Sequence, residues 1–162
     1  MDLHTALLVP HVAAGALGLG LGPVAMLLPK RLDRHGVVGR LYVAVTVVMT
    51  TSALGLVALA PRRLWGFAII AVATLVTALA GAALARRRPR GWLPVHVRLM
   101  SASYLSFVTA FLVVQWSSPL AWLLPTLVGS PLIALAVHRL PAAARTAGGG
   151  PRRSPSPAGA TG

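Results

Sequence analysis

Acidic side chains and cysteine are almost absent from this chain of 162 residues. It has no cysteine and no glutamate, and its two acids are Asp2 and Asp33. These absences exclude thiol chemistry, disulfides, iron–sulfur clusters and hydrolysis by paired carboxylates. Neither a phosphate-binding glycine loop nor a G-x-S-x-G elbow is present. We therefore assign no catalytic residue, and an enzyme is disfavoured.

Charge of either sign is also scarce. Only 10% of the residues are charged, 56% are hydrophobic, and the mean hydropathy is +0.77. Soluble domains carry roughly 25% charged residues. Five uncharged stretches are about long enough to cross some 30 Å of hydrocarbon as helices, and the ten-residue alternation of a barrel is absent. We expect an all-α, polytopic transmembrane helix bundle with spans at about 5–28, 37–60, 64–85, 97–116 and 120–137.

Two of these spans have unusual features. The first resembles a signal peptide by position, but its start holds Asp2 and no Lys or Arg, and its apolar run is too long, so we expect a retained helix. The fifth is short and contains Pro125 and Pro131. A kinked or partly re-entrant segment is the alternative there.

The cations divide unequally between the two sides of this topology. Thirteen of the 15 Lys and Arg residues fall in the loops 30–40 and 86–98 or after the last span, against Arg62 and Arg63 on the other side. The positive-inside rule then predicts the N-terminus outside and the C-terminus inside a cytoplasmic membrane. Topology and attraction to anionic lipid headgroups account for the net charge of +13. A nucleic-acid partner is not expected, because Trp92 is the only aromatic residue in these loops.

Other features follow from this topology. Trp65, Trp116 and Trp122 should mark the outer interface and Trp92 the inner one. Residues 1–140 form the expected transmembrane domain. Residues 141–162, rich in Pro, Gly, Ser and Ala, should be a disordered cytoplasmic tail. The abundance of Ala, Arg, Gly and Pro suggests a GC-rich bacterial genome.

Histidine is the remaining residue type with metal-ligand chemistry. At 100° per residue the second span has a small and polar stripe, which should face other helices: His35, Gly39, Tyr42, Thr46, Thr50 and Ala53. The same arithmetic on the fourth span collects His96, Met100, Ser103, Phe107 and Val114. His138 ends the fifth span on the same side.

His11 lies elsewhere, in the outer part of the first span, about 25 Å along the helix axis from the level of His35. Below it, Ala14, Gly18 and Gly22 have the small-xxx-small spacing that allows another helix to approach closely. We therefore expect a packing surface on this face.

Three stretches, "PHVAAGALGLGLGPVAML", "RHGVVGRLYV" and "HVRLMSASY", resemble the landmarks of a bacterial predicted-membrane-protein family, domain of unknown function 2306. The residues that match its motifs are His11 and Gly15, then His35, Gly39, Arg40 and Tyr42, then His96, Met100, Ser103 and Tyr104. Leu99 and Ala102 stand where this family tends to carry Trp and Arg. The resemblance implies a small multi-helix membrane protein and no defined activity.

Several functions are open. The histidines could be interhelical hydrogen-bonding groups in a structural or partner-binding bundle, which could also form a homo-oligomer, transport a solute or sense pH. Alternatively, His35 and His96 could ligate a haem b, with Gly39 making room for the ring and Tyr42, Met100 and Ser103 lining the site. A third alternative is a transition-metal site of His35, His96 and His138, although no carboxylate other than Asp33 is near.

Overall fold

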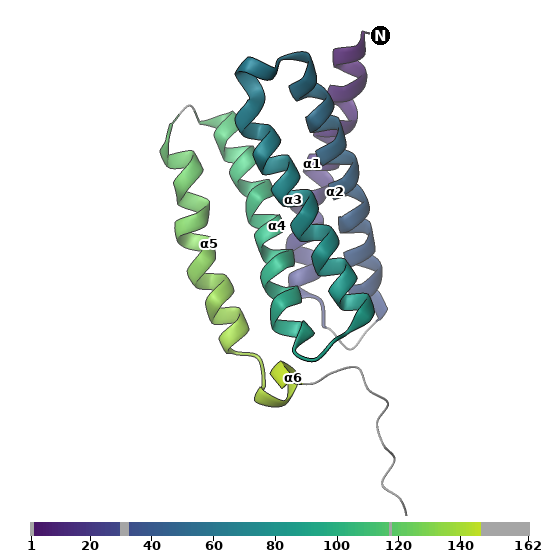
Figure 1. The fold of residues 1–162 in the computed structure, drawn as a ribbon, viewed down its shortest axis with the longest axis vertical. Coiled ribbons are helices and arrows are strands. Elements are labelled where there is room, and N and C mark those ends of the chain that lie inside the picture. The colour runs from purple at the N-terminus through teal and green to yellow at the C-terminus, as the bar shows by residue number, and fades with distance from the viewer. Residues whose placement is uncertain (1, 30–32, 117, 147–162) are drawn as a thin grey trace, which may run out of the picture.

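The computed structural model describes residues 2–29, 33–116 and 118–146. The regular elements of these residues are all helices (Figure 1): α1 Leu3–Leu27, α2 Asp33–Leu59, α3 Pro61–Arg87, α4 Trp92–Gln115, α5 Leu120–His138 and the short α6 Ala142–Thr146. The first five are long and apolar enough to span a membrane. The expected all-α bundle of five apolar spans is therefore confirmed.

Helix ends differ most from expectation at α2 and α4. These helices begin at Asp33 and Trp92, about a turn before the apolar stretches at 37 and 97. A helix can continue beyond its apolar stretch because the headgroup region solvates charged side chains. Gly91, at a φ of 68°, forms the N-cap of α4. At α1 the cap is Asp2, whose carboxylate accepts a hydrogen bond of 3.0 Å from the backbone N–H of Thr5. Hydrogen bonding with the side chain and the backbone of Thr5 lowers the pKa of this carboxyl.

The fifth span is one continuous helix of 19 residues that contains both Pro125 and Pro131. At 1.5 Å per residue this corresponds to about 28 Å, close to the thickness of the hydrocarbon. The helix is therefore long enough to cross the hydrocarbon and is not interrupted at either proline.

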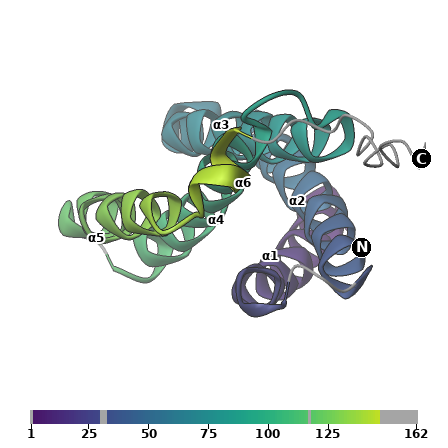
Figure 2. The same cartoon turned by 90° about the horizontal axis from the view of Figure 1, so that it is seen from below.

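Helices α1 to α4 surround a common centre (Figure 2). Along this ring, α1 packs on α2, α2 on α3 and α3 on α4, and a smaller contact between α1 and α4 completes it. Helix α5 lies outside the ring and packs on α4. The ring is thus built from two antiparallel hairpins, α1–α2 and α3–α4.

The interior of this bundle is small and partly polar. A core cluster is formed by Ala14, Tyr42, Met49 and Phe107, and several hydroxyl side chains such as Thr46 and Thr50 are buried beside it. Many large apolar side chains instead face outward, for example Leu27 and Leu127. In water this arrangement would expose large apolar patches, whereas in lipid it places apolar surface against hydrocarbon. The structure is that of a multi-pass membrane protein.

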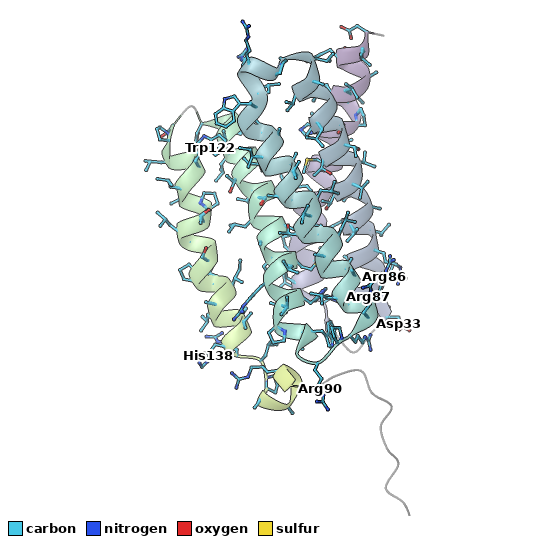
Figure 3. The ribbon with its side chains drawn as sticks, viewed as in Figure 1. Asp33, Arg86, Arg87, Arg90, Trp122 and His138 are labelled. Carbon is cyan, nitrogen blue, oxygen red and sulfur yellow. The ribbon has the colours of Figure 1, made fainter. Side chains whose placement is uncertain are left out.

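Charge separates between the two ends of the bundle (Figure 3). We call one end the arginine-rich end; among described residues it carries Arg34, Arg40, Arg86, Arg87, Arg88, Arg90, Arg98, Arg139 and Arg145. The opposite end holds Arg62 and Arg63 at the start of α3. By their places on the helices, Trp92 lies at the arginine-rich end and Trp65, Trp116 and Trp122 lie at the other end, so the expected grouping of the tryptophans by end is confirmed.

The first residues of the expected tail form α6, which packs against α4. The carbonyl oxygen of Arg145 lies 3.5 Å from the position that a Cβ of Gly91 would take. Residues 142–146 are thus folded against the bundle. The rest of the expected disordered tail, 147–162, lies outside the described residues.

Candidate functional site

Three of the five histidines bond to a backbone carbonyl of a neighbouring helix. Nδ1 of His11 lies 3.1 Å from the carbonyl oxygen of Met49, joining α1 to α2. Nδ1 of His35 lies 2.9 Å from that of Ala25, and Nδ1 of His96 lies 2.8 Å from that of Gly81. Because a carbonyl only accepts, Nδ1 must carry the proton in each bond. The tautomer of these imidazoles is therefore set by the backbone that they contact.

The acceptor of His35 is a carbonyl at the end of a helix. Ala25 lies in the last turn of α1, and residue 29, which would supply its i+4 donor, is a proline without an N–H. The His35 imidazole supplies the missing donor. The unpaired carbonyl at the end of α1 is thus one physical reason for an imidazole at the start of α2.

The two hairpins use their histidines in the same way. His35, in the first turn of α2, bonds to the last turn of α1, and His96, early in α4, bonds to the C-terminal part of α3. The His35 ring therefore joins α2 to α1, and the His96 ring joins α4 to α3. His11 bonds to Met49, which is 14 residues beyond His35 on α2, or about 21 Å along the axis. This confirms that His11 lies apart from the histidines of the arginine-rich end.

One buried hydrogen bond connects the two hairpins. Tyr42 and Ser103 each follow the histidine of their helix by seven residues, and their hydroxyl oxygens lie 2.9 Å apart. The tyrosine ring also packs on Phe107, with ring centroids 5.7 Å apart. The bond is fully enclosed, since Tyr42 is 2% exposed and Ser103 0%. The centre of the ring of helices is closed by this contact.

The middle of the expected polar stripe of α2, at Tyr42, Thr46 and Thr50, is buried. The Thr46 hydroxyl donates to the carbonyl of Tyr42 at 2.7 Å, and the Thr50 hydroxyl donates to that of Thr46 at 2.8 Å. Among the described residues no buried side-chain nitrogen or oxygen lacks a hydrogen-bond partner. This part of the stripe therefore faces other helices, as predicted, and its two threonine hydroxyls are satisfied within their own helix.

Gly39 differs from the rest of this stripe. A Cβ at this position would meet nothing within 4 Å, so the glycine is not a point of close helix approach.

On α4, Ser103 and Phe107 are buried as expected, but Val114 is 71% exposed. Gly18 and Gly22 of α1 contact Phe107 and Tyr104, which precede Val114 on α4 by two turns or more, and these contacts do not reach Val114.

The small-residue face of α1 is a packing surface, as expected. Ala14, Gly18 and Gly22 are its buried residues. Their partners are aromatic side chains of α4 rather than a helix backbone: the ring of Phe107 fills the space at Gly18, and the ring of Tyr104 fills that at Gly22. The Tyr104 hydroxyl also donates to the carbonyl of Leu19 at 3.3 Å.

Other motif residues have simple positions. Met100 packs on Gly81, and the Cγ of Met49 lies 3.9 Å from the Cβ position of Gly15. Arg40 is exposed at the arginine-rich end. His138 is exposed at the end of α5. In the described ranges no three His, Cys, Asp or Glu side chains form a group that could hold a metal, so His35, His96 and His138 are not brought together.

The sequence gives almost no indication of which backbone carbonyls accept the hydrogen bonds of the histidines. A backbone oxygen has no residue identity, and only Pro29, four residues after Ala25, marks one of them in advance. The pairing of Tyr42 with Ser103 was missed for another reason. Their shared spacing of seven residues from a histidine is visible in the sequence, but the facing of α2 and α4 across the bundle is not.

Comparisons with models of protein families, with curated proteins and with solved structures find no match for this chain. Its function is therefore inferred from its own residues and their contacts.

Proposed function

We propose that this protein is a structural or partner-binding bundle of the membrane in which the histidines connect helices. The observation that carries this proposal is the set of Nδ1–carbonyl bonds of His11, His35 and His96. Each bond lies between two helices, and the centre of the bundle is filled by the bonded Tyr42 and Ser103. The imidazoles thus join the two helices within each hairpin, and the Tyr42–Ser103 bond joins the hairpins to each other.

The test uses the full chain, expressed in haem-supplemented cells and purified in mild detergent. It measures the unfolding temperature and the absorption spectrum of each variant. We expect a colourless wild type without a Soret band. Loss of one interhelical bond should cost about 1 kcal/mol, so His35→Ala and His96→Ala should each lower the unfolding temperature by about 2 to 4 °C. The matched control is His4→Ala, since His4 is exposed at the start of α1 and makes none of these bonds. It should leave the unfolding temperature unchanged.

A haem b carrier is the second candidate, and two observations favour it. A histidine whose Nδ1–H bonds to a carbonyl is oriented in the way that ligating histidines are, and His35 is held like this. The open space at Gly39, one turn away, would also admit a flat ring. Against it, His35 is turned to α1 and His96 to α3, so no pairing of the two imidazoles follows from their contacts.

The spectra separate the two candidates. A Soret band in the wild type that disappears in both His35→Ala and His96→Ala would reject the structural proposal and establish haem ligation. An unfolding temperature that falls equally in His4→Ala would show that the interhelical bonds have no special role.

We further propose that the chain resides in a bacterial cytoplasmic membrane with its arginine-rich end inside, on the basis of its charge distribution. Membership of the domain of unknown function 2306 family is likewise a proposal, which rests on the histidine motifs alone.

A further inference from the structure

A cleft of about 710 Å³ lies between α4, α5 and α6 at the arginine-rich end. Its polar lining includes Arg98, His138 and Arg145, one from each helix. Its apolar lining includes Ala102, Ile133 and Ala134. None of these residues takes part in the histidine bonds, so a ligand in this cleft is independent of the proposed structural role of the histidines.

Contacts on either side of the cleft shape it. Toward the middle of the bundle, Gly129 of α5 packs directly on the side chain of Leu105, which brings α5 against α4. Toward the arginine-rich end, α6 turns back under α4 and places Arg145 near Gly91. Figure 1 shows α6 below the ends of α4 and α5. The cleft is therefore bounded toward the middle of the bundle by the contact of Gly129 with Leu105, and cations line its mouth at the arginine-rich end.

The charge at this mouth is not balanced by the chain. The two acids of the sequence are Asp2, which caps α1 at the opposite end, and Asp33, which begins α2. Figure 3 places Asp33 and His138 on different sides of the arginine-rich end. Neither acid lines the cleft. Arg98 and Arg145 thus line the same cleft without a carboxylate, which favours an anionic ligand.

We propose that the cleft binds one anionic phospholipid, with the phosphate between Arg98 and Arg145 and an acyl chain along Ala102 and Ile133. Guanidinium groups pair with phosphate in a bidentate geometry, and basic pockets between transmembrane helices bind lipid headgroups. The cations lie at the end of the bundle and the apolar wall extends toward its middle, which is the order of polar and apolar parts in a lipid. A free phosphate would leave the apolar wall unused.

Native mass spectrometry of the full chain in detergent tests this, with phosphatidylglycerol titrated against phosphatidylcholine. We expect the wild type to bind one phosphatidylglycerol in preference to phosphatidylcholine. Because charge-assisted bonds to the phosphate are lost, Arg98→Gln combined with Arg145→Gln should weaken this binding at least about tenfold. Arg34→Gln combined with Arg87→Gln is the matched control, since it removes the same charge from the same end outside the cleft and should retain nearly full binding.

Ile133→Trp tests the apolar part of the proposal without a change of charge. Because the larger side chain would occupy the space proposed for the acyl chain, this change should weaken phosphatidylglycerol binding as well. An equal loss in the Arg34/Arg87 control would show diffuse attraction of headgroups and overturn the proposal. Competition by inorganic phosphate together with insensitivity to Ile133→Trp would also overturn it, in favour of a free-anion site. All variants change surface or cleft residues, and an unaltered unfolding temperature verifies that each is folded.

Discussion

The glycines of α1 contribute to packing by leaving space for side chains of a neighbouring helix. At Gly18 this is the ring of Phe107 and at Gly22 that of Tyr104, whereas Gly20, on the other face, has nothing within 4 Å of its Cβ position. The spacing of small residues therefore correctly predicted the contact face. It did not predict the aromatic partners, because a glycine accommodates a ring as readily as a backbone.

Gly18→Ala should destabilise the bundle. The added methyl group would overlap the Phe107 ring, which is enclosed at 3% exposure and has little room to move. Overpacking of this kind costs about 1 to 3 kcal/mol. Thermal unfolding in detergent measures the effect, and Gly18→Ala combined with Phe107→Ala should cost less than the sum of the two single changes.

Gly20→Ala is the matched control on the same helix. Since the new methyl group meets no neighbour and alanine favours the helix, its unfolding temperature should be equal to that of the wild type or higher. A fall as large as that of Gly18→Ala would mean that α1 tolerates no alanine, whatever its contacts.

At the scale of the element, the helices themselves were predictable and their neighbours were not. Hydrocarbon offers no hydrogen-bond partner to the backbone, so each uncharged stretch has to be helical. Apolar residues surround most of these helices, however, and a helix such as α5 has large exposed side chains along its length. Where no polar or small-residue face marks the side that packs on other helices, the sequence does not show which helix packs on which. The polar stripe of α2 and the small-residue face of α1 were the exceptions, and their role in packing was predicted.

The bond between Tyr42 and Ser103 is the clearest link between the two hairpins, and a double-mutant cycle measures it. Tyr42→Phe and Ser103→Ala each remove the bond, so the double variant should be little less stable than either single variant. Interhelical bonds in membranes have coupling energies of about 0.6 kcal/mol on average, and a value near this is expected.

Thr51→Val combined with Ser103→Ala serves as the reference for this cycle. Thr51 is exposed and its hydroxyl donates within its own helix, to the carbonyl of Val47 at 2.8 Å, so its replacement should be additive with Ser103→Ala. Additive costs for the Tyr42 and Ser103 pair would contradict the bond as a link between the hairpins.

At the scale of the whole molecule, the main feature is the unequal distribution of cations between the two ends of the bundle. Five alternating helices bring the cationic loops to one end although they are far apart in the sequence. The number of spans and the division of tryptophans followed from hydropathy and were confirmed. The cleft between α4, α5 and α6 was not predicted, because it depends on residues 142–146 folding back as α6, and their sequence, three alanines followed by Arg145 and a threonine, gave no sign of it.

The orientation of this asymmetry is open to a direct test, because the chain has no cysteine of its own. Pro61→Cys and Pro89→Cys form a matched pair: both prolines are exposed, neither change removes a charge, and the two positions lie at opposite ends of the bundle. The positive-inside rule predicts that a membrane-impermeant maleimide labels Pro61→Cys in intact cells and Pro89→Cys only after permeabilisation. The cysteine-free parent chain controls for background labelling. The reverse pattern would place the arginine-rich end outside, and the positive-inside rule would then not explain its charge. Labelling of both positions from outside would contradict α3 as a membrane span.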